Sequence, residues 1–463
     1  MKIRNNTLIR AITFILFLGI FAFLGFITNY KIKFFGEITS VLFFFYAYLI
    51  TPSIHVDKIN IVSPKNLMLL IFFTRLVICP ISIILFGYKT WVLPEFPVSQ
   101  MIHKASVISD FAFFSFVIGW DLTNGARLKD AVPLQVKYRF RNNAFLALGL
   151  FFALLFFIFF FYGSFQNYVK TLFFEDYMST HEGKSKIMIY ANIMFKYVIP
   201  FFGVILGIHA LERIKIGPWG KASIALLFIV LIIILALGPS RNNIVFPVLA
   251  FLSAIIPRYF RIKFRDFILG CIVFLVLAFL FQNFRKRSNE EIISELNTNE
   301  KFIEFIQVYF VSPHIMTPMF LIEEKFDEIP FTLHSSLMET IPILGEPFRD
   351  KSGSYYYNAG YGREDARDQV FPTYGEIFFN LGYIGLFLAF ILTGFLYRQI
   401  DIFFHRKTLD DPLFRAIIFY YALVFNATIF LSYSVFAQFV FYNSVFLFVI
   451  MLLRDRPSNE RGI

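Results

Sequence analysis

The chain has 463 residues, of which 57% are hydrophobic and only 16% are charged, and its formal net charge is +11. A soluble protein of this length could not bury so large an apolar fraction, so much of its surface would stay apolar. Repeated apolar runs of about 17 to 23 residues are instead long enough to cross a bilayer core as helices. Composition therefore excludes a soluble globular domain and predicts an all-α polytopic membrane protein.

The positive charge and the cysteines exclude two further classes. The basic residues gather at the ends of apolar runs, where membrane proteins carry them, so the charge does not indicate a nucleic-acid partner. The two cysteines, Cys79 and Cys271, both fall inside apolar runs. They therefore indicate neither a disulfide framework nor a metal site.

The apolar runs predict about twelve transmembrane helices, nine before a long polar stretch and three after it. The first run follows Lys2, Arg4 and Arg10 and lacks a small-residue cleavage site, so we expect a retained helix rather than a signal peptide. Pro247 within the eighth run predicts a kinked or tilted helix. The predicted spans are 8–28, 34–50, 67–87, 99–120, 143–162, 187–209, 221–238, 242–257, 266–283, 373–397, 413–431 and 436–453.

Lysine and arginine predict the orientation, because cytoplasmic loops carry an excess of both. With the N-terminus inside, the segments assigned to the cytoplasm hold most of these residues, including the clusters at 127–141 and 398–407. This orientation places both termini in the cytoplasm. It divides the chain into helices 1–9 in residues 1–283, an extracytoplasmic loop in 284–372, and helices 10–12 in 373–463.

The extracytoplasmic loop is the one long polar interruption of the hydropathy pattern, and it holds nearly half of the acidic residues. Within it, residues 302–322 are apolar enough to resemble a span, but Glu304, Pro313 and His314 interrupt the run. We expect an amphipathic helix over 289–311, lying on the membrane surface or on a small core of the loop itself. A loop of about 90 residues can form a cap but not an independent enzyme domain.

Four ionisable residues, Arg75, Asp110, Lys196 and His209, fall at membrane depth, where such groups usually pair or line a wet cavity. Arg75 and Asp110 lie near the middles of consecutive spans, and they form either an ion pair inside the bundle or a polar vestibule open to the outer leaflet. Lys196 either extends to the interface or faces the anionic group of a lipid-linked substrate. His209 is expected to be a boundary residue at the cytoplasmic end of its span.

The first candidate site is the very short outer turn 238–243, which reads Gly-Pro-Ser-Arg-Asn-Asn. Arg241 lies there at the membrane boundary, beside serine and asparagine donors. A planar guanidinium donates two hydrogen bonds at once, which suits a diphosphate. An interfacial anchor or a headgroup contact is the alternative.

The second candidate site is the last third of the loop, residues 339–376, in which tyrosine, asparagine, arginine and carboxylates alternate. Tyrosine rings stack on sugar C–H patches while polar groups bind hydroxyls. Arginines can hold a pyrophosphate leaving group, and a carboxylate or histidine can accept a proton from an attacking hydroxyl. A solvated loop with local ion pairs is the alternative. The candidate residues are Tyr356, Tyr361, Arg349, Arg363, Arg367 and Asp365.

Other chemistries are not indicated in this stretch. Gly360-Tyr361-Gly362 lacks the third glycine and the preceding strand of a dinucleotide fingerprint. Asp365 and Asp368 are spaced to touch a divalent ion, but paired acids are common in loops. We therefore expect no metal ion and no cofactor.

The third candidate site lies where the loop runs into the tenth span. Thr373 and Glu376 fall near the outer end of that helix. An acid is favourable at a helix N-terminus for structural reasons alone, whereas a carboxylate facing a lipid-linked substrate is the functional interpretation. Gly382 and Gly385 permit close helix packing or a kink.

Together these features resemble the bacterial oligosaccharide repeat-unit polymerases, the Wzy-type O-antigen and capsule polymerases. The resemblance covers the whole architecture of about a dozen spans, one large external loop late in the chain and an aromatic-rich composition. Locally it rests on the Gly-x-Ser-Arg-like turn at 238–241, on Pro-Thr-Tyr-Gly-Glu at 372–376 and on Asn-Leu-Gly-x-x-Gly at 380–385.

The resemblance implies a metal-independent glycosyltransferase that works without a cofactor at the outer face of the bacterial cytoplasmic membrane. Such an enzyme moves a growing glycan from one polyprenyl diphosphate onto the non-reducing end of an incoming lipid-linked repeat unit. Its partners are lipid-linked oligosaccharides, the bilayer, and a flippase and chain-length regulator of the same pathway. By this resemblance, Arg241, Arg363 and Arg367 hold the diphosphate, Glu376 or Asp365 is the base, and His314 and His334 are secondary candidates.

Three alternatives remain at this point: a transporter, a glycan ligase or peptidoglycan-type polymerase, and a non-catalytic assembly partner. A lipid-linked oligosaccharide flippase or other transporter often has about twelve spans, but its two halves usually repeat and its outer loops are short. The predicted arrangement of nine spans, a long loop and three spans disfavours that class. A glycan ligase similar to the O-antigen ligases shares both the layout and the chemistry, and the sequence does not separate it from a polymerase.

Overall fold

The computed structural model describes residues 34–57, 61–87, 98–122, 186–236, 241–259, 330–341, 344–360, 371–407, 412–429 and 432–441, with short pieces within 12–23, 152–167 and 302–307 and at 320. The regular structure of these residues is helical, without a strand. The main helices are α2 (Phe35–Ile50), α3 (Pro64–Phe73), α4 (Cys79–Phe86), α5 (Val98–Leu122), α8 (Lys186–Arg213), α9 (Pro218–Leu235), α10 (Arg241–Tyr259), α16 (Thr373–Lys407) and α17 (Pro412–Ile429).

Four segments of the described chain are long and apolar enough to cross a membrane: Pro64–Phe86, His103–Leu122, Pro218–Leu235 and Thr373–His405. Three shorter apolar helices accompany them, over Phe35–Ile50, Ile244–Tyr259 and Pro412–Asn426. The predicted class of α-helical membrane protein is therefore confirmed. The predicted spans 8–28, 143–162, 266–283 and 436–453 lie partly or wholly outside the described residues, so the number twelve stays a prediction.

The predicted third span is continuous but not uniform. It begins at α3, where the side chain of Ser63 accepts a hydrogen bond from the backbone N–H of Asn66 and Pro64 occupies the first turn. A π-helical turn, η2 (Thr74–Ile78), then leads into α4, which ends at Gly87 with φ 71°. Such wide turns interrupt the regular helix and are frequent at functional sites. Here the turn carries Arg75.

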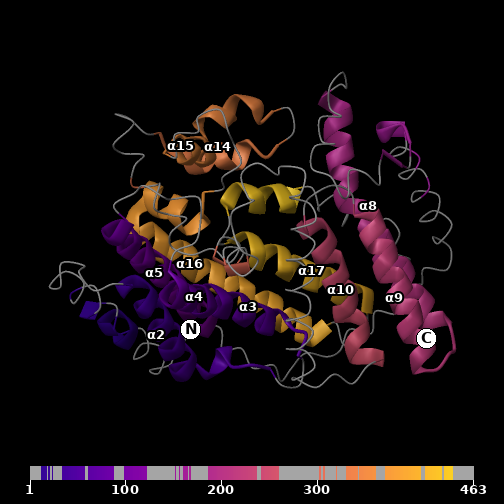
Figure 1. Cartoon of the computed structure of the whole chain (residues 1–463), viewed down its shortest axis with the longest axis horizontal. Coiled ribbons are helices and arrows are strands. Elements are labelled where there is room, and N and C mark those ends of the chain that lie inside the picture. The colour runs from indigo at the N-terminus through magenta and orange to yellow at the C-terminus, as the bar shows by residue number, and fades with distance from the viewer. Residues whose placement is uncertain are drawn as a thin grey trace, which may run out of the picture.

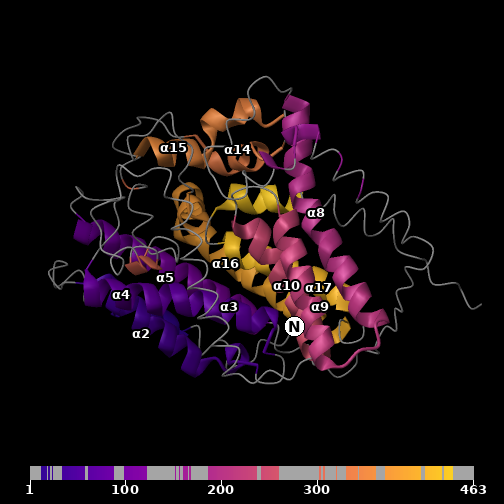
Figure 2. The same ribbon diagram turned by 45° about the vertical axis from the view of Figure 1, so that its right-hand side comes forward.

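Helix α16 lies in the middle of the molecule and packs directly on α5 (Figures 1 and 2). A Cβ atom added to Gly119 would lie 2.0 Å from the carbonyl oxygen of Ile391, and one added to Gly394 would lie 2.0 Å from that of Phe116. Glycine thus lets the two backbones touch, as small residues do in membrane helix pairs.

Two hydrophobic clusters flank this central helix. The first joins α2, α3, α5 and α16 through aromatic side chains, for example Phe72 and Phe113, whose ring centroids are 4.6 Å apart. The second joins α8, α9, α10 and α17, and Phe201 contacts Tyr420 there at 4.3 Å. Each cluster buries the apolar faces of helices that are far apart in the sequence.

Three short elements form a cap at one end of the helices (Figures 1 and 2). They are α14 (Thr332–Met338), η7 (Glu346–Lys351) and α15 (Gly353–Gly360). They lie above the first residues of α16, so α14 and the described part of the predicted last third, η7 and α15, fold against the start of the tenth span.

Helix α16 is broken close to this cap. Gly382 has φ 63° and ψ −163°, which separates a short first helix from the long one that follows. At this break the side chain of Leu381 lies against Gly385. A Cβ atom added to Gly385 would lie 2.1 Å from the Leu381 Cβ. The kink that these glycines were predicted to permit is therefore present, and it occurs at Gly382. Helix α10 contains Pro247 within its bounds, and the predicted kink or tilt there stays a prediction.

Candidate functional site

The carboxyl group of Glu376 lies where the cap meets α16. The Glu376 side chain is only 1% exposed. The hydroxyl of Ser336 donates a hydrogen bond to Glu376 Oε1 at 2.5 Å, and the hydroxyl of Thr332 donates to the same oxygen at 3.1 Å. Thr332 and Ser336 are four residues apart on α14, so both face the same way. Glu376 thereby joins the cap to the membrane helices.

Asn380, one turn after Glu376, completes this contact. Its Oδ1 accepts a hydrogen bond from the backbone N–H of Thr332 at 2.7 Å, and its Nδ2 donates to the Thr332 hydroxyl at 2.8 Å. The same Nδ2 lies 2.7 Å from the carbonyl oxygen of Glu376. The first backbone N–H groups of a helix have no partner within that helix. At the start of α14, Asn380 of α16 supplies the partner for the N–H of Thr332.

Gly353 brings α15 against the same carboxyl group. Its backbone N–H donates a hydrogen bond to the Ser336 hydroxyl at 2.8 Å. A Cβ atom at this position would lie 2.3 Å from Glu376 Oε1. Because only glycine leaves that space open, the first residue of α15 can approach Glu376 this closely. Helices α14, α15 and α16 therefore converge on one carboxylate oxygen.

The second oxygen of Glu376 is placed differently. Within the described part of the chain, Oε2 accepts no hydrogen bond, and no lysine, arginine or histidine forms an ion pair with Glu376. Tyr433 lies near enough to interact with this charge, and Glu339 adds a second acidic group nearby. One oxygen is thus held by hydroxyl donors, while the other remains available to accept a proton.

The described tyrosines of this region differ in their surroundings. Tyr357 is fully buried and stacks on Phe371 with ring centroids 4.9 Å apart, and both belong to the hydrophobic cluster that joins α2, α3, α5 and α16. Tyr356 is partly exposed, and its ring contacts Tyr355 edge-on at 5.3 Å. Burial raises the pKa of the Tyr356 hydroxyl, with a smaller contribution from Tyr355, so this group stays protonated and able to donate to a sugar oxygen.

His334 and Arg349 lie in the cap but away from Glu376. His334 is on the exposed face of α14, and its ring contacts Phe348 at 5.5 Å. Since Thr332 and Ser336 face inward, α14 does not bring the histidine to the carboxyl group. Arg349 is partly exposed in η7.

The remaining predicted site residues are placed only in part. Lys196 lies within α8 and Arg241 is the first residue of α10, and only their backbones are described. Five predicted residues fall outside the described residues: His314, Tyr361, Arg363, Asp365 and Arg367.

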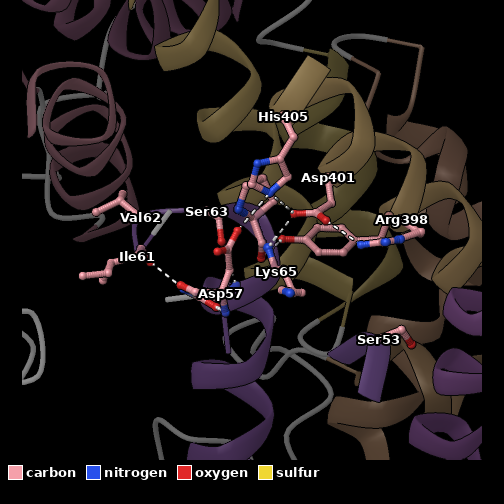
Figure 3. Close-up of polar contacts among 12 residues, drawn as sticks. Ser53, Asp57, Ile61, Val62, Ser63, Lys65, Arg398, Asp401 and His405 are labelled. Carbon is pink, nitrogen blue, oxygen red and sulfur yellow. Dashed lines mark hydrogen bonds and ion pairs between the residues drawn. The ribbon is translucent and has the colours of Figure 1, made fainter. Parts of the chain in front are cut away.

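A second polar cluster ties the far end of α16 to the start of α3 (Figure 3). Arg398 Nη1 donates to Asp401 Oδ2 at 2.8 Å, and the backbone N–H of Lys65 donates to Asp401 Oδ1 at 3.1 Å. His405 Nε2 lies 3.4 Å from Asp401 and 3.5 Å from Asp57. The cluster joins residues more than 300 positions apart, and its internal partners indicate a structural clamp.

The predicted intramembrane residues Arg75 and Asp110 are both buried, but they do not form the direct ion pair that one interpretation expected. Tyr374 lies beside both of them. Neither carboxylate oxygen of Asp110 has a hydrogen-bond partner in the described structure. Burial of both side chains also disagrees with a vestibule open to the outer leaflet.

Four residues of the Glu376 site were not predicted as site residues: Thr332, Ser336, Gly353 and Asn380. Asn380 was visible only as part of a short motif, and the i, i+4 spacing of Thr332 and Ser336 was the signal available for α14.

The chain was also compared with known proteins. No family model, curated protein or solved structure matches it.

Proposed function

We propose that the protein is a membrane glycosyltransferase that polymerises polyprenyl-diphosphate-linked oligosaccharide repeat units into O-antigen or capsule polysaccharide. Its site lies at the outer face of the bacterial cytoplasmic membrane, with both termini in the cytoplasm. The apolar helices and the polar cap over one end of them support this proposal. Such a layout suits a substrate whose lipid lies in the bilayer and whose sugars lie above it.

The observation that carries the proposal is the geometry of Glu376. A general base must be fixed in orientation and must keep an oxygen available for the proton. Ser336 and Thr332 hold Oε1, whereas Oε2 accepts no hydrogen bond from the described residues. The position at the base of the cap is where a lipid-linked acceptor would present its terminal sugar.

In the proposed reaction, a hydroxyl oxygen of the acceptor sugar attacks the anomeric carbon of the donor glycan. The bond from that carbon to the diphosphate oxygen breaks, and polyprenyl diphosphate leaves with the electron pair. Glu376 accepts the proton of the attacking hydroxyl. Developing charge on the diphosphate is stabilised by arginine, for which Arg241, Arg349, Arg363 and Arg367 are the candidates.

The variant that tests this role is Glu376→Gln. Its amide oxygen still accepts hydrogen bonds from Ser336 and Thr332, but the group no longer accepts a proton at neutral pH. We expect chain extension to fall at least about 100-fold at normal protein levels, as loss of a general base does. The measurement is the length distribution of surface glycan in a deletion strain complemented with each variant.

Ser336→Ala is the matched control, because it removes the hydrogen bonds of the Ser336 hydroxyl to Glu376 Oε1 and from the Gly353 N–H but keeps the carboxylate. It should lower stability by about 1–3 kcal/mol and leave extension measurable in the protein that folds. Arg241→Ala and Arg367→Ala should abolish extension at normal protein levels. Wild-type chain lengths in Glu376→Gln would remove Glu376 from the mechanism.

A transporter of lipid-linked oligosaccharides is the second candidate, favoured by the break of α16 at Gly382. Interrupted membrane helices are typical of transporter binding sites. The two functions differ in the deletion strain. Loss of a polymerase leaves surface glycan capped with single repeat units, whereas loss of a flippase removes lipid-linked units from the outer leaflet. A ligase would instead leave full-length chains on the lipid carrier.

A further inference from the structure

Helices α2 and α5 face each other along a stripe of buried polar side chains. Residues at i, i+3 and i+7 share one helix face, and these spacings relate Glu37 to Ser40 on α2 and His103 to Ser106 and Asp110 on α5. At the start of this stripe, a Cβ atom on Gly36 would lie 2.6 Å from Ser106 Oγ. All five side chains are buried in the structure. We call these five residues the α2–α5 seam.

The serines of the seam differ from two other hydroxyl residues of these helices, Thr39 and Ser115. Buried serine and threonine in a membrane helix usually bond back to a carbonyl one turn earlier. Thr39, next to Ser40, bonds to the Phe35 carbonyl at 2.7 Å, and Ser115, on the same helix as Ser106, bonds to the Phe111 carbonyl at 2.7 Å. Ser40 Oγ and Ser106 Oγ have no hydrogen-bond partner among the residues described.

Asp110 presents two more oxygens to the same place. Its side chain is 0% exposed, and both carboxylate oxygens lack a hydrogen-bond partner in the described structure. The hydroxyl of Ser40 lies beside this carboxyl group without forming a well-aligned hydrogen bond. Ser106 precedes Asp110 by one turn and lies on the same face. The seam thus gathers four buried oxygen atoms that have no well-aligned hydrogen bond from any described residue.

The charged groups around Asp110 do not neutralise it by contact. On α2, Glu37 is a second acidic group, and it interacts with His103 of α5. From η2, Arg75 interacts with Tyr374 of α16 and with Cys79, and Tyr374 in turn lies beside Asp110. A bare carboxylate in a dry helix bundle is strongly unfavourable. A positive charge from outside the described residues would remove this cost.

We propose that Asp110, Ser40 and Ser106 form a binding site for one monovalent cation, either Na⁺ or a proton. Oxygen ligands suit a hard cation, and carboxyl groups buried between membrane helices bind protons or Na⁺ in many membrane proteins. One carboxylate balances one positive charge. A divalent ion is disfavoured, because the described residues contain no group of three histidine, cysteine or acidic side chains that could hold a metal.

Occupation of this site would strengthen the contact between α2 and α5. It would also stabilise the neighbouring start of α16, since Tyr374 belongs to that helix and is fully buried against the same group. The inference holds whether or not Glu376 acts as a base.

The test is the thermal unfolding of the full-length protein in lipid nanodiscs. In one arm NaCl replaces choline chloride at constant ionic strength and fixed pH, and in the other the pH is lowered in Na⁺-free buffer. A ligand that binds only the folded state raises the apparent midpoint. We expect a rise of at least about 2 °C in one arm, which identifies the occupant as Na⁺ or as the proton.

Asp110→Asn should be insensitive to that cation, because a neutral amide no longer needs one. Asp121→Asn is the matched control on the same helix, since Ser53 donates to Asp121 Oδ1 at 2.9 Å and that carboxylate lies outside the seam. It should keep the wild-type response. If Asp110→Asn does not fold, the variant Ser40→Ala should weaken the response, shifting the cation concentration for half-maximal stabilisation at least about 10-fold. No response in wild type, or equal responses in wild type and Asp110→Asn, would overturn the proposal.

Discussion

At the scale of single residues, Glu376 is the side chain that joins α14 and α15 of the cap to α16. Ser336, Thr332 and Gly353 contact its Oε1 or each other, although they come from two different helices, α14 and α15. A buried carboxyl group with such partners is costly to disturb, because each donor would lose its acceptor in a site that water does not replace. The same group is therefore both the anchor of the cap and the candidate base.

Gly353→Ala tests how closely the cap is fitted to this carboxyl group. The added methyl group would lie 2.3 Å from Glu376 Oε1, so either α15 or the carboxylate must move. We expect a loss of about 1–3 kcal/mol in stability, from overpacking. Thermal unfolding measures it, and Gly19→Ala, whose added Cβ meets nothing within 4 Å, is the control. Equal midpoints for the two variants would contradict the described fit.

At the scale of the element, α16 is the most informative helix. Its first residues carry Thr373, Tyr374 and Glu376, which face the cap and the α2–α5 seam, and its last turns carry the clamp of Arg398 and Asp401. The break at Gly382 separates these two parts. Because of this break, the part of α16 before Gly382 can contact the cap while the part after Gly382 packs on α5. The Asn-Leu-Gly-x-x-Gly motif at 380–385 thus has a structural explanation that does not depend on function.

Gly382→Ala should therefore damage the cap more than the bundle. The combination φ 63° and ψ −163° belongs to a region that essentially only glycine occupies, and forcing alanine into it costs about 1–3 kcal/mol. We expect limited proteolysis to cleave the cap faster in this variant while the membrane helices stay protected. Uniform protection across the chain would show that the backbone tolerates alanine there.

At the scale of the whole molecule, two aromatic clusters are joined across a central helix. The contact between α5 and α16 depends on two glycines, Gly119 and Gly394, which oppose Ile391 and Phe116. Because the backbones touch at both points, any side chain there separates the helices. The first hydrophobic cluster and the cap both rest on this contact.

Gly394→Ala should lower the thermal midpoint of the purified protein, because its Cβ would lie 2.0 Å from the Phe116 carbonyl oxygen. The expected loss is about 1–3 kcal/mol or more. Gly119→Ala should behave alike, and the double variant should lose less than the sum, since both residues belong to one contact. Full additivity would mean that the two glycines act independently.

The sequence by itself determined the class of the molecule, because hydropathy over about 20 consecutive residues is a local property that reports directly on a bilayer-spanning helix. It also marked the two glycines at the break and singled out Glu376 as a candidate, since each is marked by residue types within a short window. The tertiary structure decided what those residues contact. Thr332 reaches Glu376 across 44 positions, Lys65 meets Asp401 across 336, and Arg75 lies by Tyr374 rather than paired with Asp110. Such partners depend on how helices pack, and packing is set by the shapes of all their faces together.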